Sequence, residues 1–160
     1  GHHEQSEFVV RRRVGDVVEF DLGDGNLAYG RVLEDPLFAF YDLRTTSTPE
    51  VVNILAAPVR FKVCVMKGAV SSGRWRVIGN QPLESDLAAP VKFYNVDVIS
   101  KALCIYDQGV EIPATIDECR GLECAAVWEA EHVEDRLRDE FAGVKNVWYE
   151  QLRIETLLKK

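Results

Sequence analysis

The sequence predicts an α+β protein, mostly β, built from a strongly bent antiparallel sheet or partly open barrel with one long amphipathic helix near the C-terminus. Two patterns predict this class. Between residues 15 and 79, runs of alternating apolar and polar residues follow one another, separated by turn residues, which is typical of sequential strands. Between residues 122 and 141, apolar residues recur at steps of three and four, which is typical of a helix with one buried face. Hairpins followed by such a helix favour a sheet covered on one face.

The first hairpin is predicted from Gly15 to Leu33. Apolar and polar residues alternate from Val18 to Leu22, and they alternate again along the return strand from residue 27 to residue 32. The intervening Gly-Asp-Gly-Asn at 23–26 supplies residues that tolerate positive φ, as a tight turn requires. We therefore expect two paired, half-buried strands at the start of the domain.

Further strands are expected after this hairpin. Aromatic and β-branched residues favour three strands, at 37–43, 59–66 and 74–79. The pattern fades at 81–90, and shorter strands are then expected at 91–94, 102–106 and 110–112. The order of the strands between 81 and 112 is not predicted.

The long helix is predicted after Gly121. From Leu122 to Phe141 the apolar residues fall on one stripe of an α-helix, and Gly143 is a suitable stop. Residues 146–158 fit either another short helix or a strand, because part of that segment also alternates.

Length and composition indicate one domain, from residue 4 to residue 160, since 160 residues can bury one sizeable core. Gly1-His2-His3 is interpreted as the remnant of an expression tag. The chain contains no apolar run of the roughly 18 residues that a membrane helix needs, and its start lacks the apolar segment of a signal peptide. We therefore expect a soluble, cytoplasmic protein.

The four cysteines are expected to be free thiols, because they form no dense framework. Cys119 and Cys124 are spaced too widely for the paired ligands of a zinc site, so neither a metal nor another cofactor is expected. His132 is the only histidine outside the tag remnant, and a hydrogen-bonding role on the helix is favoured over a catalytic one. These features predict a protein that is not an enzyme.

The charge balance indicates which partners to expect. With 26 acidic and 19 basic residues, the net charge of −7 disfavours binding to nucleic acid or to an anionic membrane. It favours a basic partner. The oligomeric state is not predicted.

One face of the predicted helix carries a candidate binding site. At about 100° per residue, four residues fall opposite the apolar stripe: Trp128, Glu131, Asp135 and Asp139. The carboxylates are predicted to contact a basic partner. Trp128 has two readings: an anchor for the same partner, or a side chain packed under the C-terminal segment, which is the favoured one.

Several residues are expected to support the structure instead. Trp75 is predicted to lie in the core. Glu123 and Arg136, polar residues within apolar surroundings, are predicted to form an ion pair that fixes the helix to the sheet.

An ordered series of short blocks carries a family resemblance. The blocks are Gly15-Asp16-Val17, Tyr29-Gly30-Arg31-Val32, Phe61-Lys62-Val63, Gly73-Arg74-Trp75, Ile78-Gly79, Gly121-Leu122-Glu123, Ala126-Val127-Trp128 and His132-Val133-Glu134-Asp135-Arg136-Leu137. In this order and spacing they resemble the immunity protein 26 family of bacterial polymorphic toxin systems, over about residues 15–143. Within the blocks, structural roles are expected for Gly30, Arg31, Gly73, Arg74, Trp75, Glu123 and Arg136.

The resemblance implies a mostly β cytoplasmic protein, encoded beside a toxin, that protects the cell by binding that toxin. It implies no catalytic residues. Two alternatives stay open. One is a β-barrel module that binds nucleic acid or a small ligand, with Trp75 set among Arg60, Lys62, Arg74 and Arg76. The other is an immunity protein that acts as an enzyme.

Overall fold

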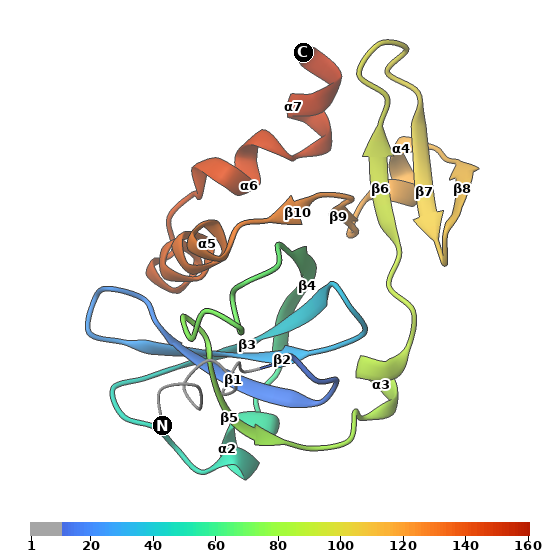
Figure 1. Ribbon diagram of the computed structural model, residues 1–160. Helices are drawn as coiled ribbons and strands as arrows, with labels where there is room; N and C mark the ends of the chain where they lie inside the picture. Colours follow the sequence, from blue (N-terminus) through green and yellow to red (C-terminus); the bar gives the residue numbers. More distant parts are fainter. Residues whose placement is uncertain (1–10) are drawn as a thin grey trace, which may run out of the picture. The chain divides into compact units, whose positions relative to one another are not determined.

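The computed structural model describes residues 11–160, so the expected tag remnant lies outside the described residues. The described chain forms two compact units (Figure 1). Unit 1 holds the residues up to Ala88 together with 128–130, and unit 2 holds residues 89–127 and 131–160. The expectation of one domain stays a prediction. None of the helices in residues 11–160 is long and apolar enough to cross a membrane.

Unit 1 is built on a six-stranded sheet with the order β10-β4-β3-β2-β1-β5. Its strands are β1 (Asp16–Asp21), β2 (Leu27–Val32), β3 (Leu37–Thr45), β4 (Val59–Val65), β5 (Arg76–Asn80) and the two-residue β10 (Val127–Trp128). The pairings from β1 to β5 are antiparallel. The predicted hairpin and the next three strands are confirmed. The sheet does not close into a barrel.

Two short helices of unit 1 were not predicted. Helix α2 (Val51–Leu55) follows the loop expected at 45–49, and α3 (Ser85–Ala88) lies in the segment without a clear pattern. Each helix places one buried side chain, Ile54 and Leu87 respectively, against one of two small clusters on the sheet. Helices of one turn give too little periodicity to be recognised in a sequence.

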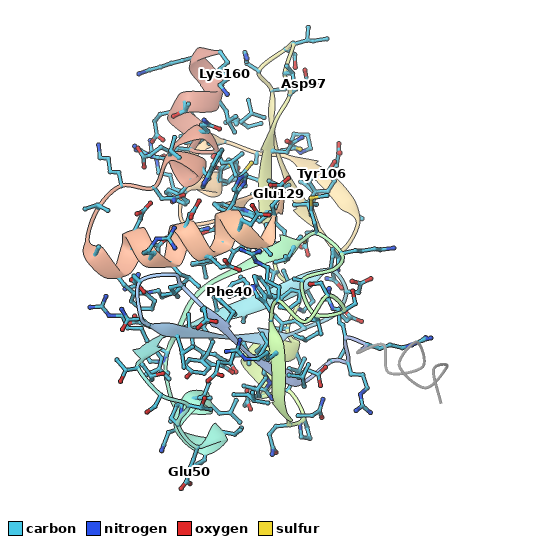
Figure 2. The ribbon with its side chains drawn as sticks, turned by 60° about the vertical axis from the view of Figure 1, so that its left-hand side comes forward. Phe40, Glu50, Asp97, Tyr106, Glu129 and Lys160 are labelled. Atoms are coloured by element: carbon cyan, nitrogen blue, oxygen red, sulfur yellow. The ribbon has the colours of Figure 1, made fainter. Side chains whose placement is uncertain are left out.

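An aromatic cluster fills the interior of unit 1. Trp75 is fully buried, stacks on Phe20 with ring centroids 4.7 Å apart, and meets Phe38 and Phe40 edge-on at 5.3 and 5.4 Å. Figure 2 shows Phe40 inside this unit. The predicted core position of Trp75 is therefore confirmed, although Trp75 itself precedes β5.

Strand β1 differs from its prediction in one respect. It is buried on both faces from Asp16 to Phe20, whereas the alternation of the sequence indicated a half-buried strand. Val17 belongs to the cluster that contains Ile54, while Phe20 belongs to the aromatic cluster. The polar residue between them, Glu19, is consequently also buried.

Unit 2 contains a four-stranded sheet with the order β8-β7-β6-β9. Its strands are β6 (Phe93–Val96), β7 (Leu103–Asp107), β8 (Val110–Pro113) and β9 (Glu123–Cys124), and α4 (Ile116–Cys119) connects the last two. β6 and β7 are antiparallel, as are β7 and β8, whereas β9 runs parallel to β6. The three short predicted strands are thus confirmed. The core of this unit consists of Tyr94, Val96, Cys119, Cys124 and Ile154 with the apolar side chains around them.

The long helix is shorter than predicted. Helix α5 spans Ala130–Ala142, whereas residues 122–128 are not helical and contain β9 and β10. The spacing of Leu122 and Ala126 matched a helical stripe, but pairing of these segments with other strands decides their structure. The helix does end before Gly143, which has a φ of 72° that glycine adopts without strain.

Two short helices complete the chain, α6 (Val147–Gln151) and α7 (Ile154–Lys159). The helical reading of residues 146–158 is therefore the correct one. The side chain of Asn146 caps α6 by accepting a hydrogen bond from the backbone N–H of Tyr149 at 2.9 Å. The fold class is as predicted: α+β, mostly β, with one long helix near the C-terminus.

Candidate partner-binding surfaces

The three carboxylates predicted to bind a partner all lie on α5, but they have different environments. Glu131 is exposed. Asp135 accepts a hydrogen bond from Trp148 Nε1 at 3.0 Å and also pairs with Arg138. Asp139 accepts a hydrogen bond from Asn146 Nδ2 at 2.9 Å. Two of the three carboxylates therefore hold the segment that follows the helix.

His132 takes part in the same arrangement. Its ring stacks on the indole of Trp148, with centroids 3.7 Å apart and an angle of 15° between the planes. Trp148 is thus fixed by a ring contact and by the hydrogen bond to Asp135. These contacts give His132 a structural explanation, and among residues 11–160 no cluster of potential metal ligands is present.

Trp128 lies elsewhere. The sequence placed it on the helix face beside Glu131, but it belongs to β10, and its carbonyl oxygen accepts a hydrogen bond from Met66 N in unit 1. Its side chain is only 4% exposed. The helical geometry that grouped Trp128 with the carboxylates does not apply, because the helix starts two residues later.

Glu123 and Arg136 form the pair expected from the sequence. Arg136 Nη1 and Nη2 donate to Glu123 Oε1 and Oε2, both at 2.8 Å, and Nε donates to Glu140 at 2.7 Å. The guanidinium also lies 4.5 Å from the ring centroid of Tyr149. Burial alone would lower the pKa of Arg136, but the hydrogen bonds and charges of Glu123 and Glu140 raise it. The pair links β9 to α5 within unit 2.

Arg31 and Gly30 are buried at the centre of unit 1. Arg31 is completely inaccessible, and its guanidinium donates to the carbonyl oxygens of Gly15, Gln81 and Pro82, to the hydroxyl of Tyr41 and to the carboxylate of Glu84. Arg31 therefore links the residue before β1 to the residues that follow β5, which are distant in the sequence. A Cβ on Gly30 would lie 3.2 Å from the Phe40 ring, so glycine permits the close packing there.

Glu19 is a buried group that the sequence did not single out. Its carboxylate accepts hydrogen bonds from Tyr29 at 2.9 Å, from Thr48 at 2.5 Å and from Arg76 at 3.1 Å. Burial alone would raise the pKa of Glu19, but the bonds from Thr48, Arg76 and Tyr29 lower it. No local signal identifies this site, because Thr48 and Arg76 lie 29 and 57 residues away.

The Gly73-Arg74-Trp75 block forms a turn that delivers Trp75 to the core. Gly73 has a φ of 82°, and the backbone N–H of Trp75 bonds to the carbonyl oxygen of Ala69 at 2.9 Å. Arg74 is exposed. Since Trp75 is fully buried, it offers no ring on which a nucleic-acid base could stack.

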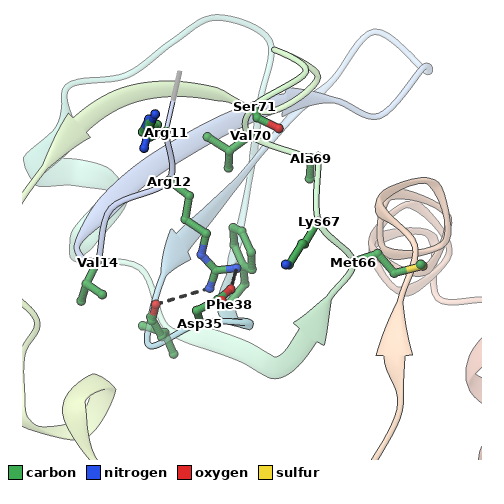
Figure 3. A pocket seen from close by; sticks show the side chains of 12 residues that line it. Arg11, Arg12, Val14, Asp35, Phe38, Met66, Lys67, Ala69, Val70 and Ser71 are labelled. Carbon is green, nitrogen blue, oxygen red and sulfur yellow. Dashed lines mark hydrogen bonds and ion pairs between the residues drawn. The ribbon is translucent and has the colours of Figure 1, made fainter. Parts of the chain in front are cut away.

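A pocket of about 570 Å³ opens in unit 1 (Figure 3). Its walls are mainly apolar, and Lys67 and Arg11 add positive charge. Arg12 crosses the pocket, where its guanidinium pairs with Asp35 at 2.8 Å and lies 4.4 Å from the centroid of the Phe38 ring. It also donates to the carbonyl oxygen of Leu37 at 2.9 Å. The cation best placed for a ligand is thus already bound to the turn between β2 and β3.

Comparison with known proteins gives one match. A family model described as Immunity protein 26 matches residues 13–105, whereas no curated protein and no solved structure matches the chain. The matched range contains β1 to β6 and reaches into β7. The blocks after residue 121 lie outside it. Because the match covers more than half of the 160 residues, the protein belongs to the immunity protein 26 family.

Proposed function

We propose that this protein is a non-enzymatic immunity protein that binds a cognate toxin directly and neutralises it in the bacterial cytoplasm. The observation that carries the proposal is the family match over residues 13–105. The buried charged groups support it, because Glu19, Arg31 and Arg136 each hold parts of the fold together. Because these three buried charges are already paired inside the fold, a partner would meet the groups on the surface instead.

The acidic side of α5 is the proposed contact for a basic toxin. Glu131 projects into solvent, while Asp135 and Asp139 add negative charge beside it as they hold Trp148 and Asn146. The net charge of −7 has the sign needed to attract a positively charged surface. Such charges speed the encounter of two proteins and set its salt dependence.

Co-expression tests the proposal. The toxin encoded beside this gene is expressed from an inducible promoter, with and without this protein, and growth is followed after induction. We expect growth only when the protein is present. Loss of viability despite abundant folded protein would contradict the proposal.

A titration separates binding from enzymatic protection. Purified protein is added to a fixed amount of the toxin, and the remaining toxin activity is measured. A binder abolishes activity at about one equivalent, since each toxin molecule must be occupied. Full protection at a small fraction of one equivalent would show turnover and would contradict the non-enzymatic part of the proposal.

A further inference from the structure

The pocket of unit 1 combines an apolar floor with a size suited to a small molecule. Its volume of about 570 Å³ lies within the range of cavities that hold small organic ligands, roughly 300–1,000 Å³. Leu33, Phe38 and Val70 line it with buried side chains, and Val14, which is 51% exposed, stands at its rim. A ligand with a hydrocarbon body would cover this apolar surface.

The lining of the pocket carries an excess of positive charge. Arg11, Arg12 and Lys67 line it, and Asp35 is the one carboxylate among its described lining residues. Asp35 pairs with Arg12 at 2.8 Å, whereas Lys67 forms no ion pair with another residue of the described range 11–160. Figure 3 shows Lys67 extending into the pocket, towards Phe38 and the guanidinium of Arg12. Because like charges repel, an anion beside Lys67 would be stabilised there.

Arg12 belongs to the wall of the pocket. Its side chain is 20% exposed, and its guanidinium donates to the carbonyl oxygen of Leu37 at 2.9 Å and lies 4.4 Å from the centroid of the Phe38 ring. Protein groups alone therefore fix this wall, and a preformed site loses little conformational entropy on binding. Lys67 is the cation that points into the pocket and can pair with a ligand.

We propose that this pocket binds a small organic monocarboxylate, whose carboxylate pairs with Lys67 Nζ and whose apolar body lies against Phe38 and Val70. The inference goes beyond the proposed function and does not depend on it. One ammonium group matches the single charge of a carboxylate, and the apolar floor matches the rest of the molecule.

Charge favours this class of ligand over phosphate and over neutral molecules. A phosphate group carries up to two charges and is bound best by several fixed donors, whereas Arg12 already donates to Asp35 and Leu37. A neutral molecule would leave the charge of Lys67 without a partner. A carboxylate on the surface of another protein shares the same chemistry, and the binding experiment separates that source from a free acid.

Titration of the full chain with phenylacetate, followed by the amide signals in heteronuclear NMR spectra, tests the inference. We expect saturable shifts at Phe38, Val70 and their neighbours. Phenylacetamide has the same shape but no charge, so it should bind about fivefold more weakly at low salt. Inorganic phosphate should cause no shifts at these residues.

Two variants separate the contributions of charge and apolar surface. Lys67→Gln should weaken phenylacetate about fivefold and abolish its advantage over phenylacetamide. Val14→Ser should weaken both ligands by a similar factor. Both side chains are exposed, so the circular dichroism spectra should not change. Lys145→Gln is the matched control, since it removes the same charge from an exposed lysine of unit 2 and should leave binding unchanged.

The contrary outcomes are distinct. Absence of saturable shifts with phenylacetate would overturn the inference. Equal binding of phenylacetamide, or shifts at the same residues with phosphate, would show that the pocket does not select a monocarboxylate. If the purified toxin shifts these signals and phenylacetate does not, the pocket is a contact for a protein, so the inference fails while the proposed function stands.

Discussion

Arg136 of α5 donates two parallel hydrogen bonds of 2.8 Å to the carboxylate of Glu123 in β9, and the Arg136 side chain is only 4% exposed. The pair joins the sheet of unit 2 to its longest helix, and Glu140 supplies a second carboxylate to the same guanidinium. A buried pair of this kind is costly to break from one side, because the remaining charge loses its partner without regaining water.

We therefore expect Arg136→Ala to lower the free energy of unfolding by about 3–5 kcal/mol, measured by urea denaturation. Arg138→Ala on the same helix is the control. Its ion pair with Asp135 is more exposed, so the loss should stay below about 1 kcal/mol. A double-mutant cycle with Glu123→Gln should give a coupling energy of about 0.5–3 kcal/mol, and a value of zero would exclude the structural role of the pair.

Acid should destabilise the protein in part through Glu19. The folded protein holds the pKa of Glu19 below its ordinary value, so this group contributes stability above the pKa of the unfolded chain, about 4.3. That contribution is lost as pH falls through the folded pKa. Denaturation between pH 6 and pH 3 should show a shallower pH dependence for Glu19→Gln than for the wild-type protein.

Thr48→Val provides a second check on Glu19. It removes the shortest hydrogen bond to the carboxylate and leaves Tyr29 and Arg76 in place. The pKa of Glu19 should therefore rise, and acid unfolding should begin at a higher pH than in the wild-type protein. If the wild-type protein, Glu19→Gln and Thr48→Val show identical acid transitions, Glu19 does not contribute to the pH dependence of stability.

The parts of the fold that sequence predicts are those set by neighbouring residues. Alternation from Val18 to Leu22, followed by a glycine-rich turn, identifies β1 and β2 because a hairpin pairs residues close in sequence. Residues 122–128 were assigned wrongly to the helix, since β9 pairs with β6 about 30 residues earlier and β10 joins β4, still farther away. Helical spacing there was coincidental.

In the candidate site too, the features set by neighbouring residues are predicted from the sequence, and those set by distant residues are not. Glu131, Asp135 and Asp139 do share α5, as a period of 3.6 residues requires. The sequence does not predict that two of these carboxylates accept hydrogen bonds from Trp148 and Asn146. Those bonds depend on how the segment after α5 packs against the helix.

Cysteine reactivity should follow burial. All four cysteines are free, and burial raises the pKa of the Cys124 thiol to about 11. Because the thiolate is the reactive form, Cys124 should be alkylated by iodoacetamide at pH 8 more slowly than Cys104, which is partly exposed on β7. Mass spectrometry of timed samples measures the order. Faster modification of Cys124 would show that the core of unit 2 opens readily.

The acidic side of α5 should act through its charge alone, which isosteric variants can test. Glu131→Gln, Asp135→Asn and Asp139→Asn together remove three charges but keep oxygen acceptors for Trp148 and Asn146. Reversal to lysine would instead disrupt the docking of α6. We expect the triple variant to bind the toxin with a several-fold lower kon at low salt, and the difference should vanish near 0.5 M salt.

A second triple variant separates local charge from net charge. Glu34→Gln, Glu50→Gln and Asp86→Asn neutralise three exposed carboxylates of unit 1 and change the net charge by the same amount. Since steering depends on charges close to the contact, this control should keep most of the wild-type kon. If both triple variants lower kon equally, the effect belongs to the net charge of the protein. If the α5 variant does not lower kon, the acidic side of α5 is not part of the interface. Either variant should leave koff unchanged, because charges at the rim of an interface mainly change the rate of association, whereas contacts buried at its centre determine the rate of dissociation.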